Sequence, residues 1–153
     1  MNVGPASVSP DQFETLAAFG EKVILHLTGK HTAGKVTAWT EITPPGGGPP
    51  PHYHLKEDEW FMVGEGTMAF FYDDQWHELG PGGVAFMPRE TIHTFKNIGT
   101  TPSRMLVHTS PSGFETFFAH CAQEFAKPDG PDMQRIVEIG IEHGIHFLPP
   151  PPA

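Results

Sequence analysis

The sequence predicts a mainly β protein, in which one sandwich or barrel of short antiparallel strands is followed by two helices. Gly and Pro, 17 of each among 153 residues, make up about a fifth of the chain, against a usual share of about an eighth. So many turn-forming residues exclude a long-helix protein. An apolar content of 38% with 12 Phe excludes a disordered chain. After residue 110 the apolar spacing changes from that of strands to that of helices.

The N-terminal segment, residues 1–22, contains a signal for the start of a helix. Pro10 follows a candidate N-cap at Ser9, and Phe13, Leu16 and Ala17 come after it at helical spacing. We therefore expect a short helix ahead of the β body.

Residues 23–110 contain seven short runs of β-branched, aromatic and aliphatic residues, which we expect to be strands. Turn-forming segments such as Gly64–Gly66, Asp73–Asp74 and Gly80–Gly83 separate them. Strands at this regular spacing are typical of an antiparallel sandwich or barrel. The seven runs are Val23–Thr28, Val36–Thr43, Glu59–Val63, Thr67–Tyr72, Gln75–Glu78, Val84–Met87 and Ser103–Thr109.

Residues 111–153 are expected to form two helices and a Pro-rich tail, within one domain overall. Ser112 and Glu115 stand at the spacing of a capping box, ahead of an apolar stripe formed by Phe114, Phe117, Phe118, Cys121, Ala122 and Phe125. A second helix fits Asp132 to His143, with Gly144 as its stop and an apolar face of Met133, Ile136, Val137 and Ile141. We expect both helices to pack outside the barrel or against a second subunit, and Pro149–Pro152 to be extended.

Composition also limits the partners and the location of the protein. A net charge of −9 with three Arg argues against nucleic acid and against an anionic membrane as partners, because both require a basic surface. The lone Cys121 excludes an intrachain disulfide and a cysteine-based zinc site. The sequence has neither a signal peptide nor a run of about 18 apolar residues, so we expect a soluble cytoplasmic protein.

Ten His in a chain of this length direct attention to a metal site. His52 and His54 point the same way if the chain is extended there, although such a pair arises easily by chance. Its surroundings form the longer pattern Gly46-x5-His52-x-His54-x4-Glu59-x6-Gly66.

A second block follows as Gly82-x5-Pro88-x4-His93-x3-Asn97. Together the two blocks, residues 46–97, resemble the paired signature motifs of the cupin superfamily, whose fold is a compact jelly-roll or β-barrel. The chain is similar to small, single-domain, quercetinase-like cupins. One position departs from the pattern, because Glu90 stands where the second motif usually has Gly.

The resemblance implies that His52, His54, Glu59 and His93 hold one divalent metal inside the barrel. Three imidazoles and one carboxylate suit Fe, Mn, Ni, Cu or Zn better than Ca or Mg. The alternative is a barrel without metal that keeps a hydrogen-bonded histidine cluster. Glu57 and Asp58, the acidic neighbours of Glu59, are expected to be solvated.

Strand alternation predicts which side chains line the pocket beside the metal. If Glu59 points inward, Phe61 and Val63 do so as well, and Phe95 shares a face with His93. His108, on a later strand, is a further candidate for this pocket. Aromatic walls suit a flat apolar or aromatic substrate.

Three functions fit these residues. The first is a metal-dependent dioxygenase acting on a small enolic or phenolic substrate with O2, in which Glu59 is a ligand that doubles as catalytic base. The second is a non-redox lyase or isomerase at the same ion, and the third is a non-catalytic small-molecule binder. Small cupins commonly dimerise, so we also expect a homodimer.

Overall fold

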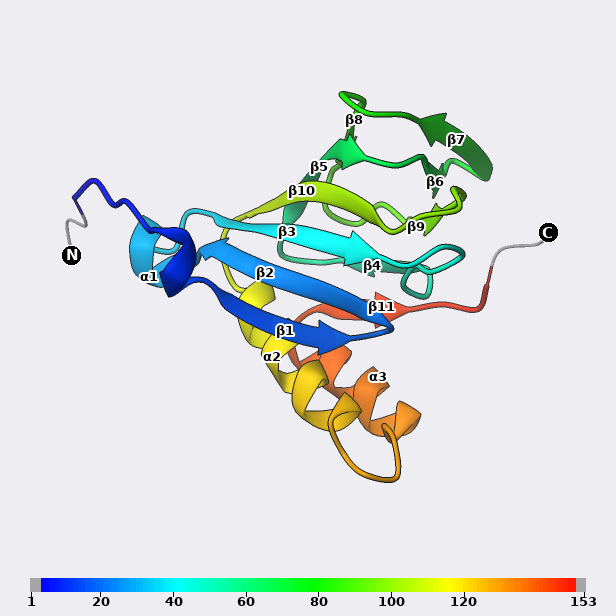
Figure 1. Ribbon diagram of the computed structural model, residues 1–153. Coiled ribbons are helices and arrows are strands. Elements are labelled where there is room, and N and C mark those ends of the chain that lie inside the picture. The colour runs from blue at the N-terminus through cyan, green and yellow to red at the C-terminus, as the bar shows by residue number, and fades with distance from the viewer. Residues whose placement is uncertain (1–3, 151–153) are drawn as a thin grey trace.

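The computed structural model describes residues 4–150. Within them, the largest sheet has six strands in the order β1-β2-β3-β10-β5-β8, and smaller sheets have the orders β7-β6-β9 and β11-β4 (Figure 1). The strands are β1 (Glu14–Ala18), β2 (Glu21–Leu27), β3 (Thr37–Thr43), β4 (His52–His54), β5 (Asp58–Glu65), β6 (Met68–Tyr72), β7 (Gln75–Leu79), β8 (Val84–Met87), β9 (Thr94–Asn97), β10 (Ser103–Ser110) and β11 (Ile145–Phe147).

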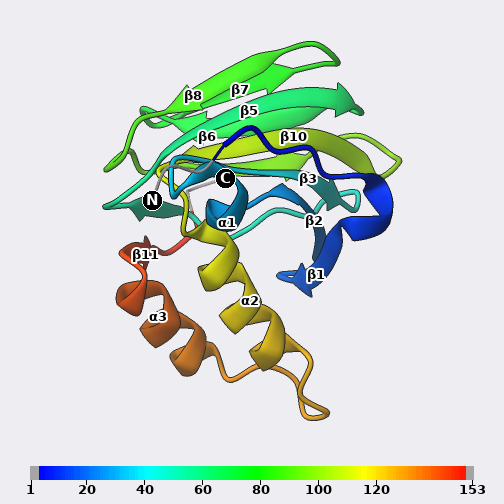
Figure 2. The same ribbon diagram turned by 90° about the vertical axis from the view of Figure 1, so that its left-hand side faces the viewer.

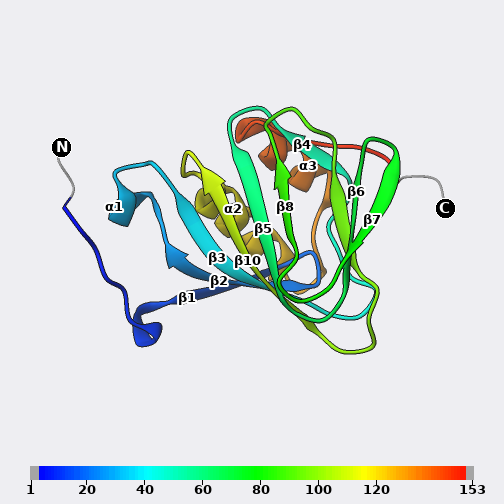
Figure 3. The same cartoon turned by 90° about the horizontal axis from the view of Figure 1, so that it is seen from above.

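The six-stranded and three-stranded sheets face each other when the molecule is seen from above (Figure 3), and the hydrophobic core fills the space between them and continues to buried residues of the segment 114–145. Phe61 of β5 packs edge-on against Phe70 of β6 and Phe95 of β9, with ring centroids 5.2 and 5.7 Å apart. Strands β3 and β10 bury every second residue, as strands with one face on a core do. The predicted mainly β architecture is confirmed.

The helix predicted near the N-terminus is wrong. Pro10–Gln12 form a single 3-10 turn, η1, and the chain then enters β1, which pairs antiparallel with β2. Phe19 and Gly20 both have positive φ (55° and 74°), as in the two-residue type I′ turns that favour a hairpin. The long-range pairing of β1 therefore overrides the local helix signal.

Helix α2 (Phe114–Phe125) forms where predicted, but the capping box does not. Gly113 occupies the N-cap position without a side-chain cap. The Glu115 carboxylate instead accepts hydrogen bonds from the backbone N–H of Gly113 and Gly29, at 2.9 and 2.8 Å, and from the hydroxyl of Thr37. Because Glu115 lies one position too early for a capping box, its side chain ties α2 to the β body.

Helix α3 (Met133–Glu142) begins as predicted, since the Asp132 side chain accepts hydrogen bonds from the backbone N–H of Gln134 and Arg135. Its predicted apolar face is only partly right. Ile136 and Ile139 are buried, whereas Met133, Val137 and Ile141 are exposed. Helices α2 and α3 lie side by side beneath the sheets (Figure 2). The short helix α1 (Gly29–Thr32) follows β2.

The sheets include residues on both sides of the predicted barrel range. β1 joins the six-stranded sheet, and β11, which follows the helices, pairs with β4 through the register Ile145↔His54 and Phe147↔His52. Of the predicted Pro-rich tail, residues 149 and 150 have no regular structure, and the remainder lies outside the described residues. No helix in the described part of the chain is both long and apolar enough to cross a membrane.

Candidate metal centre

The strand β4 carries the first two residues of the predicted ligand set. His52 and His54 are buried, whereas Tyr53 between them is turned outward and stacks on His146. His52 also bridges to His93, with backbone N–H···O distances of 3.0 and 2.9 Å between the two residues. The bridge brings two sites 41 positions apart in the sequence into direct contact.

The fourth residue, Glu59, reaches the same point from the inner face of β5. Its Oε1 lies 3.3 Å from His93 Nε2, and its Oε2 lies 3.7 Å from His54 Nε2. One ligand atom from each of His52, His54, Glu59 and His93 lies within 4.8 Å of all the others. All four residues are at most 7% exposed, so the predicted convergence of four side chains inside the barrel is present.

Each imidazole is held from behind by an acceptor on its Nδ1 atom. His52 Nδ1 lies 2.8 Å from the carbonyl oxygen of Pro50, and His93 Nδ1 lies 2.9 Å from that of Thr91. His54 Nδ1 lies 3.2 Å from a carboxylate oxygen of Glu57. Because an acceptor at Nδ1 places the proton of a neutral ring there, Nε2 is the nitrogen of each ring that is left to bind a cation at the centre.

The prediction that Glu57 is a solvated loop charge is therefore wrong. Glu57 is 5% exposed, and the hydrogen bond to His54 accounts for its burial. Carboxylates behind metal-binding imidazoles orient the ring and raise its basicity. Asp58, by contrast, lies at the surface and pairs with the guanidinium of Arg89 at 3.1 Å.

The charges at the centre influence one another. Burial would raise the pKa of Glu59, but the neighbouring His54 and His93 lower it overall. Burial would lower the pKa of His54, yet the carboxylates of Glu59 and Glu57 raise it overall. The pKa of His52 falls well below its usual value because of burial and the other two imidazoles. A neutral His52 is the form that binds a metal.

The donor set fits a divalent transition metal. His54 Nε2 is buried and has no hydrogen-bond partner among the described residues, a costly arrangement unless another group satisfies it. Three imidazole nitrogens and one carboxylate match the preferences of Fe, Mn, Ni, Cu and Zn. The four residues could hold one such ion.

The turn that departs from the motif packs directly beside this centre. Glu90 adopts the left-handed conformation with φ of 72°, which Gly tolerates better than any other residue. Its backbone N–H still donates to the carbonyl oxygen of His54 at 2.7 Å. The turn therefore keeps the geometry that the usual Gly would provide, at the cost of backbone strain.

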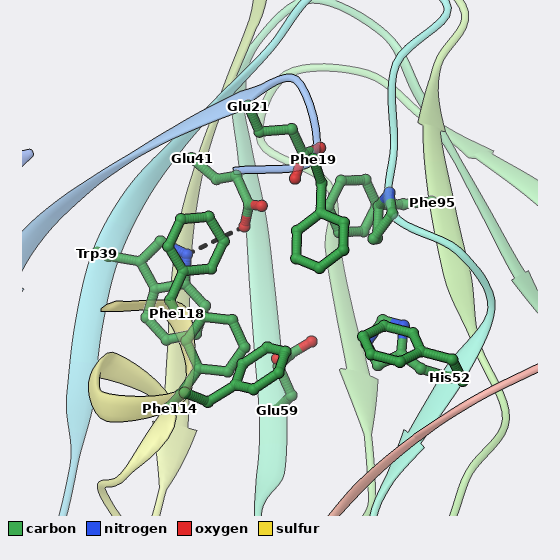
Figure 4. Close-up of a pocket in the computed structure, with 12 residues that line it drawn as sticks. Phe19, Glu21, Trp39, Glu41, His52, Glu59, Phe95, Phe114 and Phe118 are labelled. Atoms are coloured by element: carbon green, nitrogen blue, oxygen red, sulfur yellow. Dashed lines mark hydrogen bonds between the residues drawn. The ribbon is translucent and has the colours of Figure 1, made fainter. Parts of the chain in front are cut away.

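A largely aromatic cavity adjoins the candidate metal centre (Figure 4). Its enclosed space is small, about 30 Å³. His52 and Glu59 line it at one end, and Glu21 and Glu41 line it as well. Seven aromatic residues form most of the remaining wall, namely Phe19, Trp39, Phe95, Phe114, Phe117, Phe118 and Phe147.

Only one of the residues predicted to line the pocket does so in the structure. Phe95 lines the cavity, whereas Phe61 and Val63 face inward but belong to the packed core beside it. The prediction for His108 is wrong, because it lies on the outer face of β10, where its ring packs edge-on against Trp60 at 5.8 Å. The neighbouring Val107 and Thr109 point inward instead.

Two carboxyl groups in the cavity were missed by the sequence analysis. Glu21 and Glu41 lie on adjacent strands, β2 and β3, and are 3% and 4% exposed. Burial raises the pKa of both groups, and the neighbouring charge of Glu41 raises that of Glu21 further. One signal in the sequence was available: Glu41 stands two residues after Trp39 in a predicted strand, so both side chains point to the same, inward face.

The helical side of the cavity was also missed. Phe114, Phe117 and Phe118 of α2 turn toward the barrel and are at most 8% exposed. The stripe that could have packed on a second subunit is therefore covered within the chain. Because α2 contributes walls to the cavity, it belongs to the site.

Residues 39–109, which include all four candidate ligands, match the family model described as Cupin domain. No curated protein matches the chain.

Several solved structures are similar in fold. KdgF from Halomonas sp. superposes with a TM-score of 0.65 at 16% identity, covering 74% of this chain and 99% of that one. A sugar phosphate isomerase of the cupin superfamily from Silicibacter pomeroyi gives 0.60 at 22%, covering 69% and 75%. The polyketide cyclase RemF from Streptomyces resistomycificus gives 0.59 at 24%, covering 70% and 80%. The fold is thus the mainly β cupin fold with C-terminal helices.

Proposed function

We propose that this protein is a cupin enzyme that holds one divalent transition metal on His52, His54, Glu59 and His93 and converts a small enolic or phenolic substrate. The convergence of these four buried side chains at the wall of an aromatic cavity supports the proposal. A bound ion would act as a Lewis acid that polarises a substrate oxygen. With one carboxylate ligand, a 2+ ion keeps a net charge of +1, which favours an anionic oxygen ligand.

The chain's own residues define the substrate class. Phenyl and indole rings surround most of the cavity, and they favour a flat, largely apolar molecule. The enclosed space is about 30 Å³, so it admits only a small group of this molecule unless the surrounding side chains move. Glu59 is engaged by His54 and His93, so we assign it to metal binding and no longer to base catalysis.

Two reaction classes fit this site. The dioxygenase expected from the likeness to quercetinase-like cupins is supported by the aromatic walls and by a donor set that leaves room for substrate and O2. A non-redox isomerase or cyclase is supported by the second pair of carboxyl groups, because a proton-transfer reaction needs such groups. Two of the similar structures are an isomerase and a cyclase.

The first experiment is metal analysis of protein purified without a chelating resin. We expect about one transition metal ion per chain in the wild type and none in His93→Ala, with the same circular dichroism spectrum. His108→Ala, which changes an outward-facing histidine, serves as the matched control and retains its metal. Full metal occupancy in His93→Ala contradicts the ligand assignment.

The second experiment separates the reaction classes. Oxygen consumption is followed with Fe-, Mn- and Ni-loaded protein and a panel of flavonols, catechols and β-diketones. Uptake with any of them supports the dioxygenase. Proton exchange into a β-diketone without oxygen uptake supports the non-redox enzyme, and binding without turnover supports a non-catalytic binder.

The expected homodimer stays a prediction. Its remaining support is the exposed apolar side chains of the edge strand β8, Val84 and Phe86, and of α3, Met133, Val137 and Ile141. Sedimentation velocity measures the oligomeric state directly.

A further inference from the structure

We propose that Glu21 and Glu41 form a carboxyl pair that holds one shared proton and exchanges it with an oxygen of the ligand in the cavity. The first half of this inference concerns the protein alone. The second half rests on the proposed function, because it requires a ligand beside the metal centre.

Each carboxyl group of the pair has one hydrogen-bond donor among the described side chains. Trp39 Nε1 donates to Glu41 Oε2 at 3.0 Å, and Thr43 Oγ1 donates to Glu21 Oε1 at 3.0 Å. The two side chains are both buried and line the same cavity from adjacent strands, and a carboxyl group can donate a hydrogen bond to its neighbour only when it carries the hydrogen.

The charge balance favours one proton on the pair. Among residues 4–150, no Lys, Arg or His forms an ion pair with Glu21 or Glu41. The carboxylate of Glu59 is a further negative charge that raises the pKa of both groups. Two buried, unpaired negative charges side by side are costly, and two such carboxyls commonly share one proton. The pair therefore carries a net charge of −1.

The pair lies where it can exchange its proton with a ligand in the cavity. Figure 4 shows Glu21 and Glu41 on one side of the cavity, with Glu59 and His52 on another side and aromatic rings around them. The titratable side chains that line the cavity are these four. Because His52 and Glu59 belong to the candidate metal centre, Glu21 and Glu41 are the groups left to exchange protons with a ligand.

The proton transfer needs no other reactant. An enol or phenol O–H gives its proton to the ionised carboxylate of the pair, which becomes two neutral carboxylic acids, and the negative charge stays on the ligand oxygen. In the reverse direction the pair returns a proton to an oxygen or carbon of the ligand and regains its charge of −1. This chemistry interconverts keto and enol forms.

Infrared spectroscopy of the metal-free protein at pH 7 tests the shared proton. A protonated carboxyl group gives a C=O stretching band separate from those of carboxylates and amides. We expect this band in the wild type and in the surface control Glu78→Gln, and its loss in both Glu21→Gln and Glu41→Gln. In each variant the new amide can donate the hydrogen bond to the remaining carboxylate. Absence of the band in the wild type, or its persistence in both variants, overturns the inference.

Binding of acetylacetone, a small β-diketone, to the zinc-loaded protein tests the role toward a ligand. We expect Glu21→Gln and Glu41→Gln to bind zinc like the wild type and to bind acetylacetone about 10- to 100-fold more weakly, the loss typical of a hydrogen bond with a charged group. Unchanged affinity in both variants, or no binding by the wild type, overturns this half of the inference. Failure to bind zinc contradicts the proposed function but leaves the infrared result valid.

Discussion

The metal centre and the Glu21–Glu41 pair are both polar clusters buried in one cavity, yet different groups stand behind them. Acceptors stand behind the three imidazoles, namely two carbonyl oxygens and the carboxylate of Glu57. Donors stand behind the carboxyl pair, namely the indole of Trp39 and the hydroxyl of Thr43. Acceptors at Nδ1 leave the Nε2 atoms to bind a cation. The donors favour ionised carboxylates, and the proposed shared proton follows instead from burial and from the neighbouring negative charges. The two clusters thus differ in charge: one joins imidazoles to a carboxylate, and the other brings two carboxyl groups together without a cation among the described residues.

The largest effect is expected from a substitution that removes metal binding and leaves the Glu21–Glu41 pair unchanged. His93→Ala removes one of four ligands, and we expect metal affinity to fall by far more than the roughly 10- to 100-fold loss typical of supporting residues. The infrared band of the Glu21–Glu41 pair should remain. Loss of both signals would show that the two clusters depend on one fold element, and the independence inferred here would be wrong.

Next in size is the removal of the group behind His54. Glu57→Ala leaves the His54 Nδ1–H without its acceptor, so we expect metal affinity to fall by about 10- to 100-fold. Glu57→Gln keeps an acceptor oxygen and should lose less. Competition with a chromophoric chelator measures both. Equal affinities in the wild type and Glu57→Ala would mean that Glu57 is structural only.

The pH dependence of the free energy of unfolding tests the Glu21–Glu41 pair by itself. The raised pKa of the pair means that the folded protein binds one proton more than the unfolded chain above about pH 4.5, the usual pKa of Glu. Stability contributed by the pair therefore falls as pH rises through this window, by about 1.4 kcal/mol per pH unit. We expect metal-free Glu21→Gln to lose this slope in urea denaturation at several pH values. Parallel profiles of variant and wild type would argue against the shared proton.

The next prediction concerns helix α2, which forms one wall of the cavity. The Glu115 carboxylate ties this helix to the β body, so its removal should destabilise the protein. Glu115→Gln should lower the free energy of unfolding by about 1–3 kcal/mol. Burial would raise the pKa of Glu115, but hydrogen bonds from Thr37 and from the backbone of Gly29 and Gly113 lower it overall. Its contribution is thus present at neutral pH and is lost as pH falls through the lowered pKa.

Urea titrations at pH 7 and pH 3 test this, with the exposed Glu65→Gln as control. An equal difference between Glu115→Gln and the wild type at both pH values would contradict the assignment.

The smallest effect concerns the turn beside the metal centre. Glu90→Gly relieves the positive φ of this residue and should stabilise the protein by about 0.5 kcal/mol, because the greater freedom of Gly in the unfolded chain offsets part of the gain. Glu90→Ala keeps the Cβ atom and should bring no gain. A denaturation midpoint for Glu90→Gly at or below that of Glu90→Ala would show that the turn is unstrained.

How far the sequence predicts the site differs between the two clusters. His52, His54, Glu59 and His93 could be found because a motif preserves their spacing, and strand alternation then places them on one face. Glu21 and Glu41 belong to no motif. A single Glu on a strand is usually solvated, and only long-range pairing of β2 with β3 shows that these two meet in the interior.

The errors have physical causes too. Both faces of β10 carry apolar residues, so alternation alone cannot decide whether His108 or Val107 points inward. Glu57 stands in a loop, where local spacing predicts solvent exposure, and its burial depends on an imidazole three residues earlier. The helix expected near Ser9 was replaced by β1 because pairing with β2 satisfies more backbone groups than one isolated turn.

The pairing of β11 with β4 has a consequence for the order in which the molecule comes apart. The strand with His52 and His54 is held by β11, the last strand among residues 4–150, and by backbone bonds from Leu148 to Pro51 and from Leu55 to Gly144. A mechanical load applied at the C-terminus would peel β11 away while the six-stranded sheet is still intact. In a force experiment, the strand that carries two of the candidate ligands would thus lose the support of β11 at the first rupture event and keep its backbone bonds to His93 and Glu90.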